Sequence, residues 1–158
     1  QLDKIGERLF KNTNLKLRNQ LMNKCCQLEC EYLSKEGGNL YPDLEKTLNI
    51  LSKKYKLFIV SNCQCGYIES FYKGHNLEKY FTDKLSAGET GLSKGENNKI
   101  IIERNHIKNA IYVGDTQGDK QSAVDAGIPF VYAEYGFGSV DGYDYKIEKF
   151  SDLIKIFK

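Results

Sequence analysis

Two aspartates follow the short apolar run of residues 110–113 in the pattern Gly-Asp-x-x-x-Asp, which places carboxylates at Asp115 and Asp119. One carboxylate lies at the predicted end of a strand and the other enters the next helix, so both can face a common point. Such ligands suit Mg²⁺, which commonly takes one or two carboxylates together with waters and substrate phosphate. The structural alternative is a turn in which aspartate stabilises a helix N-terminus. The local sequence leaves both interpretations open.

Two further polar sites have a similar relation to the predicted elements. Ser61 and Asn62 follow the apolar run of residues 57–60, where a hydroxyl and backbone N–H groups can bind an anion. A turn or a helix N-cap explains the same residues without any ligand. Lys94 lies in the glycine-flanked loop of residues 91–95. A single lysine is normally solvated surface, and this one is of interest only together with the other positions.

The order of the predicted elements explains why these positions belong together. Residues 1–40 carry leucines at helical intervals and predict helix only, ended by Gly37 and Gly38. From residue 41 onward, short apolar runs alternate with helical segments. This pattern is typical of an α/β fold with a Rossmann-like parallel sheet and helices on both faces. Ligands of such sheets bind at the carboxyl ends of the strands, where the serine and the aspartates are expected.

The charge balance argues against two classes of partner. The 158 residues carry 23 Lys and Arg against 21 Asp and Glu, which gives a formal net charge of +2. No excess of one sign is available for a nucleic-acid backbone or an anionic membrane surface. No apolar stretch approaches the ~18 residues of a membrane span, and no apolar signal-peptide core occurs at the start. We therefore expect no nucleic-acid partner and no membrane.

The cysteines predict neither a disulfide framework nor a zinc site. Their number is odd, and the spacing fits neither kind of site. We interpret them as ordinary buried or half-buried thiols in a reducing cytoplasm. The five cysteines are Cys25, Cys26, Cys30, Cys63 and Cys65.

Taken together, the motifs resemble the haloacid-dehalogenase-like (HAD) superfamily. The strand ending in Ser61-Asn62, the loop lysine Lys94 and the Asp115-x-x-x-Asp119 pattern are similar to the family's second, third and fourth motifs, in the same order. The flanking sequences are similar as well, including a proline-led helix before the serine strand. The resemblance covers about residues 41–158 and points to the phosphoglycolate-phosphatase-like branch, whose members carry a helical cap.

The resemblance implies a division of the chain, and the sequence departs from the family pattern at two points. Residues 1–40 are similar to part of the helical cap, and residues 41–158 to the α/β core.

The family's lysine is often followed by proline, whereas Gly95 follows here and is expected to leave the loop more flexible. The first motif, Asp-x-Asp-Gly-Thr after an apolar strand, is absent. No residue of this chain is therefore assigned as the nucleophile.

The resemblance implies Mg²⁺-dependent hydrolysis of a small phosphate monoester through an aspartyl-phosphate. In that scheme Ser61 and Lys94 are the catalytic residues of this chain: the serine hydrogen-bonds a phosphoryl oxygen and the lysine supplies positive charge. Asn62 adds its backbone N–H to the phosphate site. Asp115 ligates Mg²⁺ directly, and Asp119 is a ligand through water or an orienting neighbour. The substrate would be a small phosphorylated metabolite, enclosed by the cap.

Other functions fit parts of the same pattern. A sugar-phosphate mutase shares the chemistry up to the covalent intermediate. A dehalogenase is less expected, because paired aspartates indicate a metal that halide displacement does not need. A non-catalytic binding module derived from the family would explain why the nucleophile motif is absent.

The topology of the family adds one expectation. Its first-motif strand lies between the strand ending in Ser61 and the strand ending in Asp115. Without that strand, unpaired backbone groups would be buried at ~1–3 kcal/mol each, against a net stability of ~5–15 kcal/mol. We expect the slot to be filled by an N-terminal segment missing from this sequence or by a strand from another chain, as in a swapped dimer. The remaining alternative is direct pairing of residues 57–60 with residues 110–113.

Overall fold

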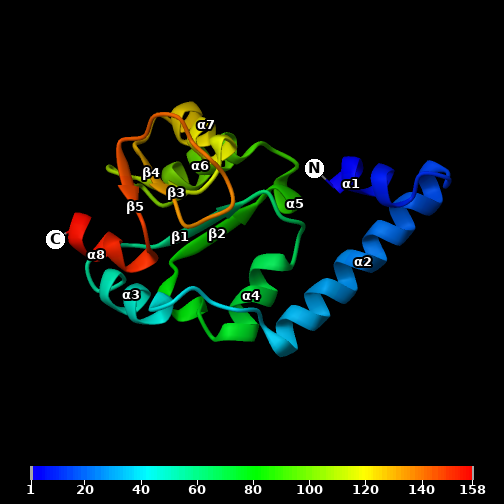
Figure 1. Cartoon of the computed structure of the whole chain (residues 1–158), viewed down its shortest axis with the longest axis horizontal. Helices are drawn as coiled ribbons and strands as arrows, with labels where there is room; N and C mark the ends of the chain where they lie inside the picture. The colour runs from blue at the N-terminus through cyan, green and yellow to red at the C-terminus, as the bar shows by residue number, and fades with distance from the viewer. Residues whose placement is uncertain (1, 158) are drawn as a thin grey trace.

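The molecule has an α/β body from which a helical extension projects (Figure 1). The computed structural model describes the backbone of residues 2–157 and the side chains of residues 4–157. The extension consists of α1 (Leu2–Leu9) and α2 (Leu15–Glu36), which confirms the helical prediction for this part of the chain. Its assignment to a cap stays a prediction.

The body alternates helices and strands, which confirms the predicted α/β class. In chain order its elements are α3 (Leu44–Leu51), β1 (Phe58–Ser61), α4 (Tyr67–His75), the 3-10 turn η1 (Glu78–Tyr80), β2 (Asp83–Ser86), α5 (Ala87–Thr90), α6 (Lys94–Arg104), β3 (Tyr112–Gly114), α7 (Gln117–Ala126), β4 (Phe130–Ala133), β5 (Tyr145–Ile147), the 3-10 turn η2 (Phe150–Asp152) and α8 (Leu153–Ile156).

The strands form two parallel sheets rather than one. β1 pairs with β2, and the second sheet has the order β3-β4-β5. Within residues 2–157, no backbone hydrogen bond joins β1 to β3. The direct pairing that the sequence left as an alternative therefore does not occur in this part of the chain.

Strands β1 and β3, which lie where the two sheets meet, are only half-buried. Every residue of β1 and β3 is half-buried, whereas all four residues of β4, which is paired on both edges, are buried. One side-chain hydrogen bond connects the two strands: the Tyr112 hydroxyl donates to the Val60 carbonyl oxygen at 2.9 Å. Interior parallel strands are normally buried on both faces. β1 and β3 therefore have the exposure of edge strands, although they lie close enough for this contact.

Helices cover both faces of the second sheet, as predicted. Side chains alternate across a strand, so successive residues of β4 face opposite sides. Val131 and Ala133 belong to a core cluster with Leu51 of α3 and Leu153 of α8. The other two residues of β4, Phe130 and Tyr132, pack with Ala123 of α7 on the opposite face.

The structure corrects one local prediction and adds two strands. Pro42 precedes the helix that it was expected to open, because α3 begins at Leu44 after Asp43 in the left-handed conformation, at φ 57°. Strands β2 and β5 were not predicted, because β2 is half polar and β5 has only three residues.

The long helix α2 is attached to the body near its C-terminal end. It has no buried residue, and it ends at Gly37 with φ 64°. At the crossing with α4, a side chain on Gly74 would collide with the Leu33 carbonyl oxygen, so glycine permits the close approach. In Figure 1 the helix runs from α4 away from the sheets.

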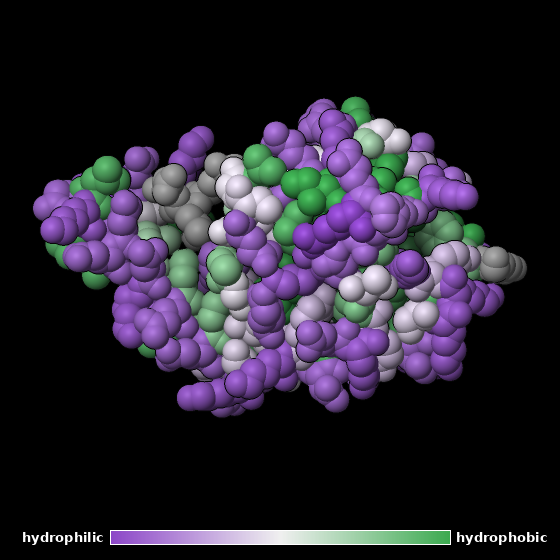
Figure 2. All heavy atoms as spheres, turned by 180° about the vertical axis from the view of Figure 1, so that it is seen from behind, coloured by the Kyte–Doolittle hydropathy of each residue, from purple (hydrophilic) through white to green (hydrophobic). Residues whose placement is uncertain are grey.

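The face of the molecule opposite to that of Figure 1 is largely hydrophilic (Figure 2). The helical extension, at the left of that view, carries apolar side chains among polar ones. Exposed apolar residues of this extension include Leu9, Leu15 and Leu28. None of the helices described here is long and apolar enough to cross a membrane.

Candidate active site

Asp119 lies in the first turn of α7, and donors occupy both of its carboxylate oxygens. Oδ2 accepts hydrogen bonds from Thr116 Oγ1 at 2.7 Å, from the Thr116 N–H at 3.0 Å and from the Asp115 N–H at 3.2 Å. Oδ1 accepts one from Lys94 Nζ at 2.5 Å. Burial alone would raise the pKa of Asp119, but the bonds from Lys94 and Thr116 outweigh it and hold the pKa below its ordinary value. Asp119 is thus an ionised group that orients its neighbours.

Lys94 is the first residue of α6 rather than a loop residue. Ser93 and Glu96 cap this helix reciprocally, which fixes the direction in which the chain enters it. The Lys94 side chain is 16% exposed and reaches across to Asp119. Its Nζ also lies over the ring of Tyr112, 6.0 Å from the ring centroid. The ammonium is therefore held in one place by a carboxylate and an aromatic ring.

Gly95 has a packing role that the sequence interpretation missed. It was expected to loosen a loop, but it lies inside α6 and is buried. A Cβ at this position would be 2.7 Å from the Asp125 Cβ of α7. Glycine therefore lets the two helices approach closely, which brings Lys94 within reach of Asp119.

Asp115 follows β3 directly, and one of its two carboxylate oxygens accepts a hydrogen bond from the backbone. Its Oδ2 accepts a hydrogen bond from the Phe137 N–H at 2.8 Å. Among the residues whose side chains are described, none donates a hydrogen bond to its Oδ1. Gly136 approaches so closely that an added Cβ would collide with the Asp115 side chain. The loop after β4 therefore supports the carboxylate from one side and leaves the other oxygen available to a ligand.

Ser61 ends β1, and the loop after it is held from two directions. The Ser61 Oγ accepts a hydrogen bond from the Cys63 N–H at 3.3 Å. On one side, a side chain at Gly88 would collide with the backbone of Cys65. On the other side, Gln64 Nε2 donates to Glu29 Oε2 of α2 at 3.0 Å. The loop that begins at the exposed Asn62 thus contacts both the body and the helical extension.

The structure brings some of the predicted residues into direct contact and relates the others indirectly. Lys94, Asp115 and Asp119 are connected by hydrogen bonds through Asp119. Ser61 belongs to the other sheet, and its neighbour Val60 is connected to β3 by the Tyr112 hydroxyl. Sequence reasoning missed Tyr112, Thr116 and Gly136 as parts of this region. A threonine three residues before Asp119 is a capping signal that could have been recognised.

Comparison with known proteins identifies the family. The family model of haloacid dehalogenase-like hydrolases matches residues 2–133. The chain belongs to this family. It is 26% identical over 117 residues to the phosphoglycolate phosphatase of Escherichia coli, a match that covers 71% of the chain and 46% of the relative. The phosphoglycolate phosphatase of Salmonella choleraesuis is 23% identical over 132 residues, with 77% and 52% covered. The chain thus spans about half the length of these curated relatives.

Solved structures of HAD proteins share the fold. A predicted phosphoglycolate phosphatase from Haemophilus somnus superposes with a TM-score of 0.81 at 21% identity, over 99% of this chain and 74% of that one. A HAD phosphatase from Thermococcus onnurineus has a TM-score of 0.73 at 27% identity, with 90% and 69% covered. The predicted superfamily, the phosphoglycolate-phosphatase-like branch and the Rossmann-like fold class are confirmed.

The family resemblance implies Mg²⁺, an ion that needs oxygen ligands at this strand end. No group of three or more His, Cys, Asp or Glu side chains is gathered for a metal in the part of the chain that the structure describes. Asp115 offers one free carboxylate oxygen, whereas both oxygens of Asp119 are engaged. One or two carboxylates suffice for Mg²⁺ when water and phosphate supply the other ligands. The residues therefore fit such an ion, with Asp115 as its ligand and Asp119 as the neighbour that holds the backbone of Asp115.

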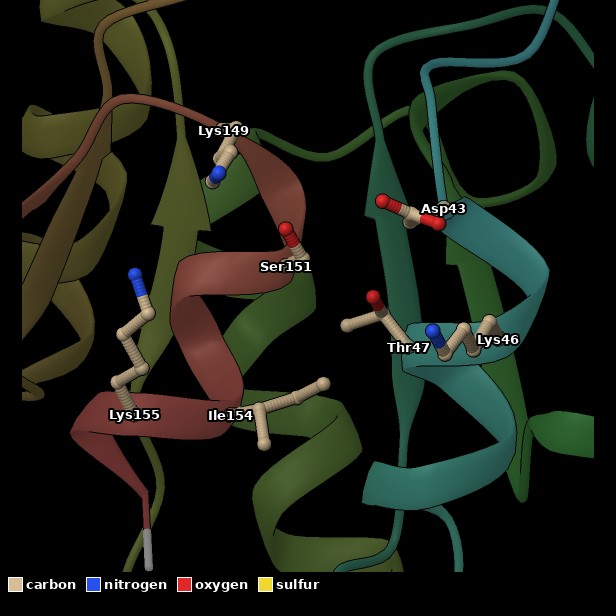
Figure 3. Close-up of a pocket in the computed structure, with 7 residues that line it drawn as sticks. All are labelled: Asp43, Lys46, Thr47, Lys149, Ser151, Ile154 and Lys155. Atoms are coloured by element: carbon tan, nitrogen blue, oxygen red, sulfur yellow. The ribbon is translucent and has the colours of Figure 1, made fainter.

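A pocket of about 290 Å³ lies elsewhere, between α3 and the C-terminal segment (Figure 3). None of the predicted site residues lines it. It is lined by Asp43, Lys46, Thr47, Lys149, Ser151, Ile154 and Lys155. In Figure 3, Thr47 and Ile154 point toward one another across the pocket. The lining combines cations, a carboxylate and an apolar contact, so it selects no single class of ligand. One of the cations, Lys155, pairs with Asp152 at 2.8 Å.

Proposed function

We propose that this protein is a phosphatase that hydrolyses a small phosphate monoester with Mg²⁺ as cofactor. One observation carries the proposal: Asp119 holds Lys94 and the backbone of Asp115 together, while one oxygen of Asp115 accepts no hydrogen bond from the described residues. A phosphoryl group needs cationic and metal charge at fixed positions, because positioning and charge neutralisation account for most of its catalysis. The phosphoglycolate phosphatases among the relatives make a small phosphorylated acid the first substrate to test.

The residues of this chain have distinct roles in the proposal. Lys94 neutralises charge on the phosphoryl oxygens, and Asp119 keeps its ammonium in place. Asp115 holds the metal, which supplies further positive charge to the phosphoryl group when bound. Ser61 donates its hydroxyl to a phosphoryl oxygen, and the backbone N–H of Asn62 lies next in the same loop. The nucleophile is not among these residues, and the proposal places it on a segment next to β1 and β3.

The half-buried strands β1 and β3 support a place for that segment. Each lacks the full burial that β4 obtains from two neighbours. A strand added between them would pair on both edges, at a spacing of about 4.8 Å to each neighbour. We propose that the complete assembly contains such a strand, from a longer form of the chain or from a second chain in a swapped dimer. The five thiols, all free here, are consistent with a cytoplasmic protein.

The function can be tested with the full-length protein. Release of inorganic phosphate from phosphoglycolate and from p-nitrophenyl phosphate is measured with Mg²⁺, with EDTA, and after Mg²⁺ is restored. The proposal expects turnover that EDTA abolishes and Mg²⁺ recovers. Phosphate release that is unaffected by EDTA contradicts the metal assignment. Absence of release from a broad panel of phosphomonoesters contradicts the enzymatic proposal and favours a binding module.

A further inference from the structure

The connection from β2 to α6 lies between two side chains that the proposal assigns to phosphate binding. In the pairing of β1 with β2, Ser61 lies directly opposite Ser86, the last residue of β2. The chain then passes through the short helix α5, at the end of β2 in Figure 1, and reaches Lys94 at the start of α6. The conformation of this connection therefore sets the position of Lys94 relative to Ser61.

The connection lies away from the slot between β1 and β3. Strand β2 already pairs with one edge of β1, so the proposed additional strand must pair with the other edge. The connection also contacts the loop after Ser61, because the Gly88 N–H donates to the Cys63 carbonyl oxygen at 2.9 Å. These contacts therefore remain in place when the slot is filled.

Two reciprocal caps fix the ends of the connection. Before α5, Glu89 Oε2 accepts a hydrogen bond from the Ser86 N–H at 2.8 Å. Before α6, Glu96 Oε2 accepts one from the Ser93 N–H at 2.9 Å. Each cap fixes the direction in which the chain enters one helix. Neither cap joins the first helix to the second, and the turn between them contains Gly91 in the left-handed conformation, at φ 72°.

The Thr90 hydroxyl makes the link between the two helices. It donates to Asn97 Oδ1 of α6 at 2.8 Å, and the Ser86 carbonyl oxygen lies 3.2 Å away as a second acceptor. The same oxygen accepts a hydrogen bond from the Leu92 N–H in the turn at 3.1 Å. Asn97 is 0% exposed, and among the described residues its side chain has no other hydrogen-bond partner. One hydroxyl therefore holds the end of β2, the turn and a buried amide of α6 together.

We propose that Thr90 is a positioning residue, which fixes the start of α6 against the end of β2 and so holds Lys94 in place relative to Ser61. The catalytic consequence rests on the proposed phosphatase function, whereas the structural part does not. Without the hydroxyl, the buried oxygen of Asn97 loses its donor, which costs free energy unless the segment moves or admits water. Because Lys94 is the first residue of α6, movement of this helix start displaces its ammonium.

The test separates the hydroxyl from the rest of the Thr90 side chain. Thr90→Val removes the hydroxyl and keeps the branched shape, whereas Thr90→Ser keeps the hydroxyl. Thr13→Val is the matched control, because the Thr13 hydroxyl donates to the Phe10 carbonyl oxygen at 2.7 Å in the helical extension. Circular dichroism and thermal unfolding establish that the variants fold. Thr90→Ala, which also lacks the hydroxyl, replaces Thr90→Val in every comparison if the valine variant does not fold.

The first measurement is kinetic, on the full-length protein with p-nitrophenyl phosphate. Small displacements of a reacting group can cost about a hundredfold in rate. We expect Thr90→Val to lower kcat/KM by about ten- to a hundredfold, mainly through kcat. Thr90→Ser should stay within about threefold of the original protein and Thr13→Val within about twofold. An active original protein whose Thr90→Val variant keeps kcat/KM within about twofold, or whose Thr90→Ser variant loses as much as Thr90→Val, would overturn the inference.

The second measurement does not depend on activity and also uses the full-length protein. Amide hydrogen exchange is followed in residues 91–97, and each variant is compared after correction for its change in global stability. We expect faster exchange in this segment for Thr90→Val, and no selective change for Thr90→Ser or Thr13→Val. Unchanged exchange in the Thr90→Val variant refutes the positioning role. An inactive original protein whose Thr90→Val variant shows the selective change refutes the proposed function and leaves the structural part supported.

Discussion

Lys94 and Asp119 form an ion pair at 2.5 Å between the first turns of two neighbouring helices. The carboxylate is 7% exposed and also accepts bonds from Thr116 and from the Asp115 N–H. Removal of one partner from a buried pair leaves the other charge uncompensated, which is strongly destabilising. The pair therefore contributes to the fold and to the candidate site at once.

Replacing Asp119 by Asn tests this double role. We expect Asp119→Asn to lower the free energy of unfolding by about 3 kcal/mol at pH 7, because the Lys94 charge loses its partner. Urea unfolding measures the change, with Asp141→Asn as the control, because Asp141 is exposed and its carboxylate accepts no hydrogen bond among the described residues. Equal stability of the two variants at pH 7 would contradict the structural role of the pair.

The same variant carries a pH signature. The pKa of Asp119 is lower in the folded state than its ordinary value of 3.8, so the stability that it contributes is present above that value. This stability is lost as pH falls through the folded pKa. The unfolding free energy of the original protein should therefore fall more steeply below about pH 4 than that of Asp119→Asn. Parallel curves below this pH would show that Asp119 is not the group concerned.

Asp115→Asn separates the candidate ligand from the fold. The exchange removes charge and almost no volume, and the amide oxygen can still accept the bond from the Phe137 N–H. We expect thermal stability within about 0.5 kcal/mol of the original protein, as for most substitutions that leave packing intact. In the full-length protein, Mg²⁺-dependent phosphate release should disappear. Near-normal activity without metal would show that the metal role is wrong.

Gly136→Ala tests the support of Asp115 by the following loop. The added methyl would collide with the Asp115 side chain, because it would lie 2.2 Å from the Asp115 Cβ. Overpacking of this kind costs about 1–3 kcal/mol. Gly118→Ala is the control, because its Cβ would meet nothing closer than Thr116 Oγ1 at 3.6 Å and a helical alanine replaces a helical glycine. Differential scanning calorimetry should therefore show a lower Tm for the first variant and an equal or higher Tm for the second.

Thr47→Val tests a buried hydroxyl at the pocket between α3 and the C-terminal segment. Thr47 is 0% exposed, and its Oγ1 has no hydrogen-bond partner among the described residues. A desolvated hydroxyl without a partner is costly, and valine has nearly the same shape. We expect Thr47→Val to raise the free energy of unfolding by about 1 kcal/mol in chemical denaturation. A loss of stability would indicate that the hydroxyl has a partner in solution.

Hydrogen exchange in the original protein tests the proposed strand between β1 and β3. Residues 58–61 and 112–114 should be strongly protected in the complete assembly, where both edges are paired. The chain of residues 1–158 alone, measured under the same conditions, should exchange faster in these segments than in β4, which is already paired on both edges. Rapid exchange of both segments in the complete assembly would refute the filled slot.

The sequence predicted the parts of the fold that depend on local patterns. Apolar runs identified β1 and β3, and the alternation of such runs with helical segments identified the α/β class. Strand β2 was not predicted, because its first two residues, Asp83 and Lys84, are charged. Both side chains form salt bridges, with Arg104 and Glu89 among their partners, and these contacts depend on the tertiary fold.

The candidate site was predicted as a set of positions but not as a set of contacts. The spacing of Asp115 and Asp119 indicated two carboxylates at one strand end, yet it gave no sign that one of them would be committed to Lys94. That commitment depends on the close approach of α6 and α7 at Gly95, which was taken for a loop glycine. The contact of Tyr112 was hidden as well, because its partner is the backbone carbonyl of Val60 in a distant strand.

The attachment of α2 at one end makes this helix a lever. Its 22 residues span about 33 Å, and the crossing with Gly74 together with the bond from Gln64 to Glu29 holds its C-terminal half. From that crossing to the far end the helix is about 27 Å long, so a tilt of about ten degrees would move the far end by about 5 Å. Gln64 lies in the loop that follows Ser61. A load on the far end of the helix would therefore be transmitted, as torque, to the loop that is proposed to bind phosphate.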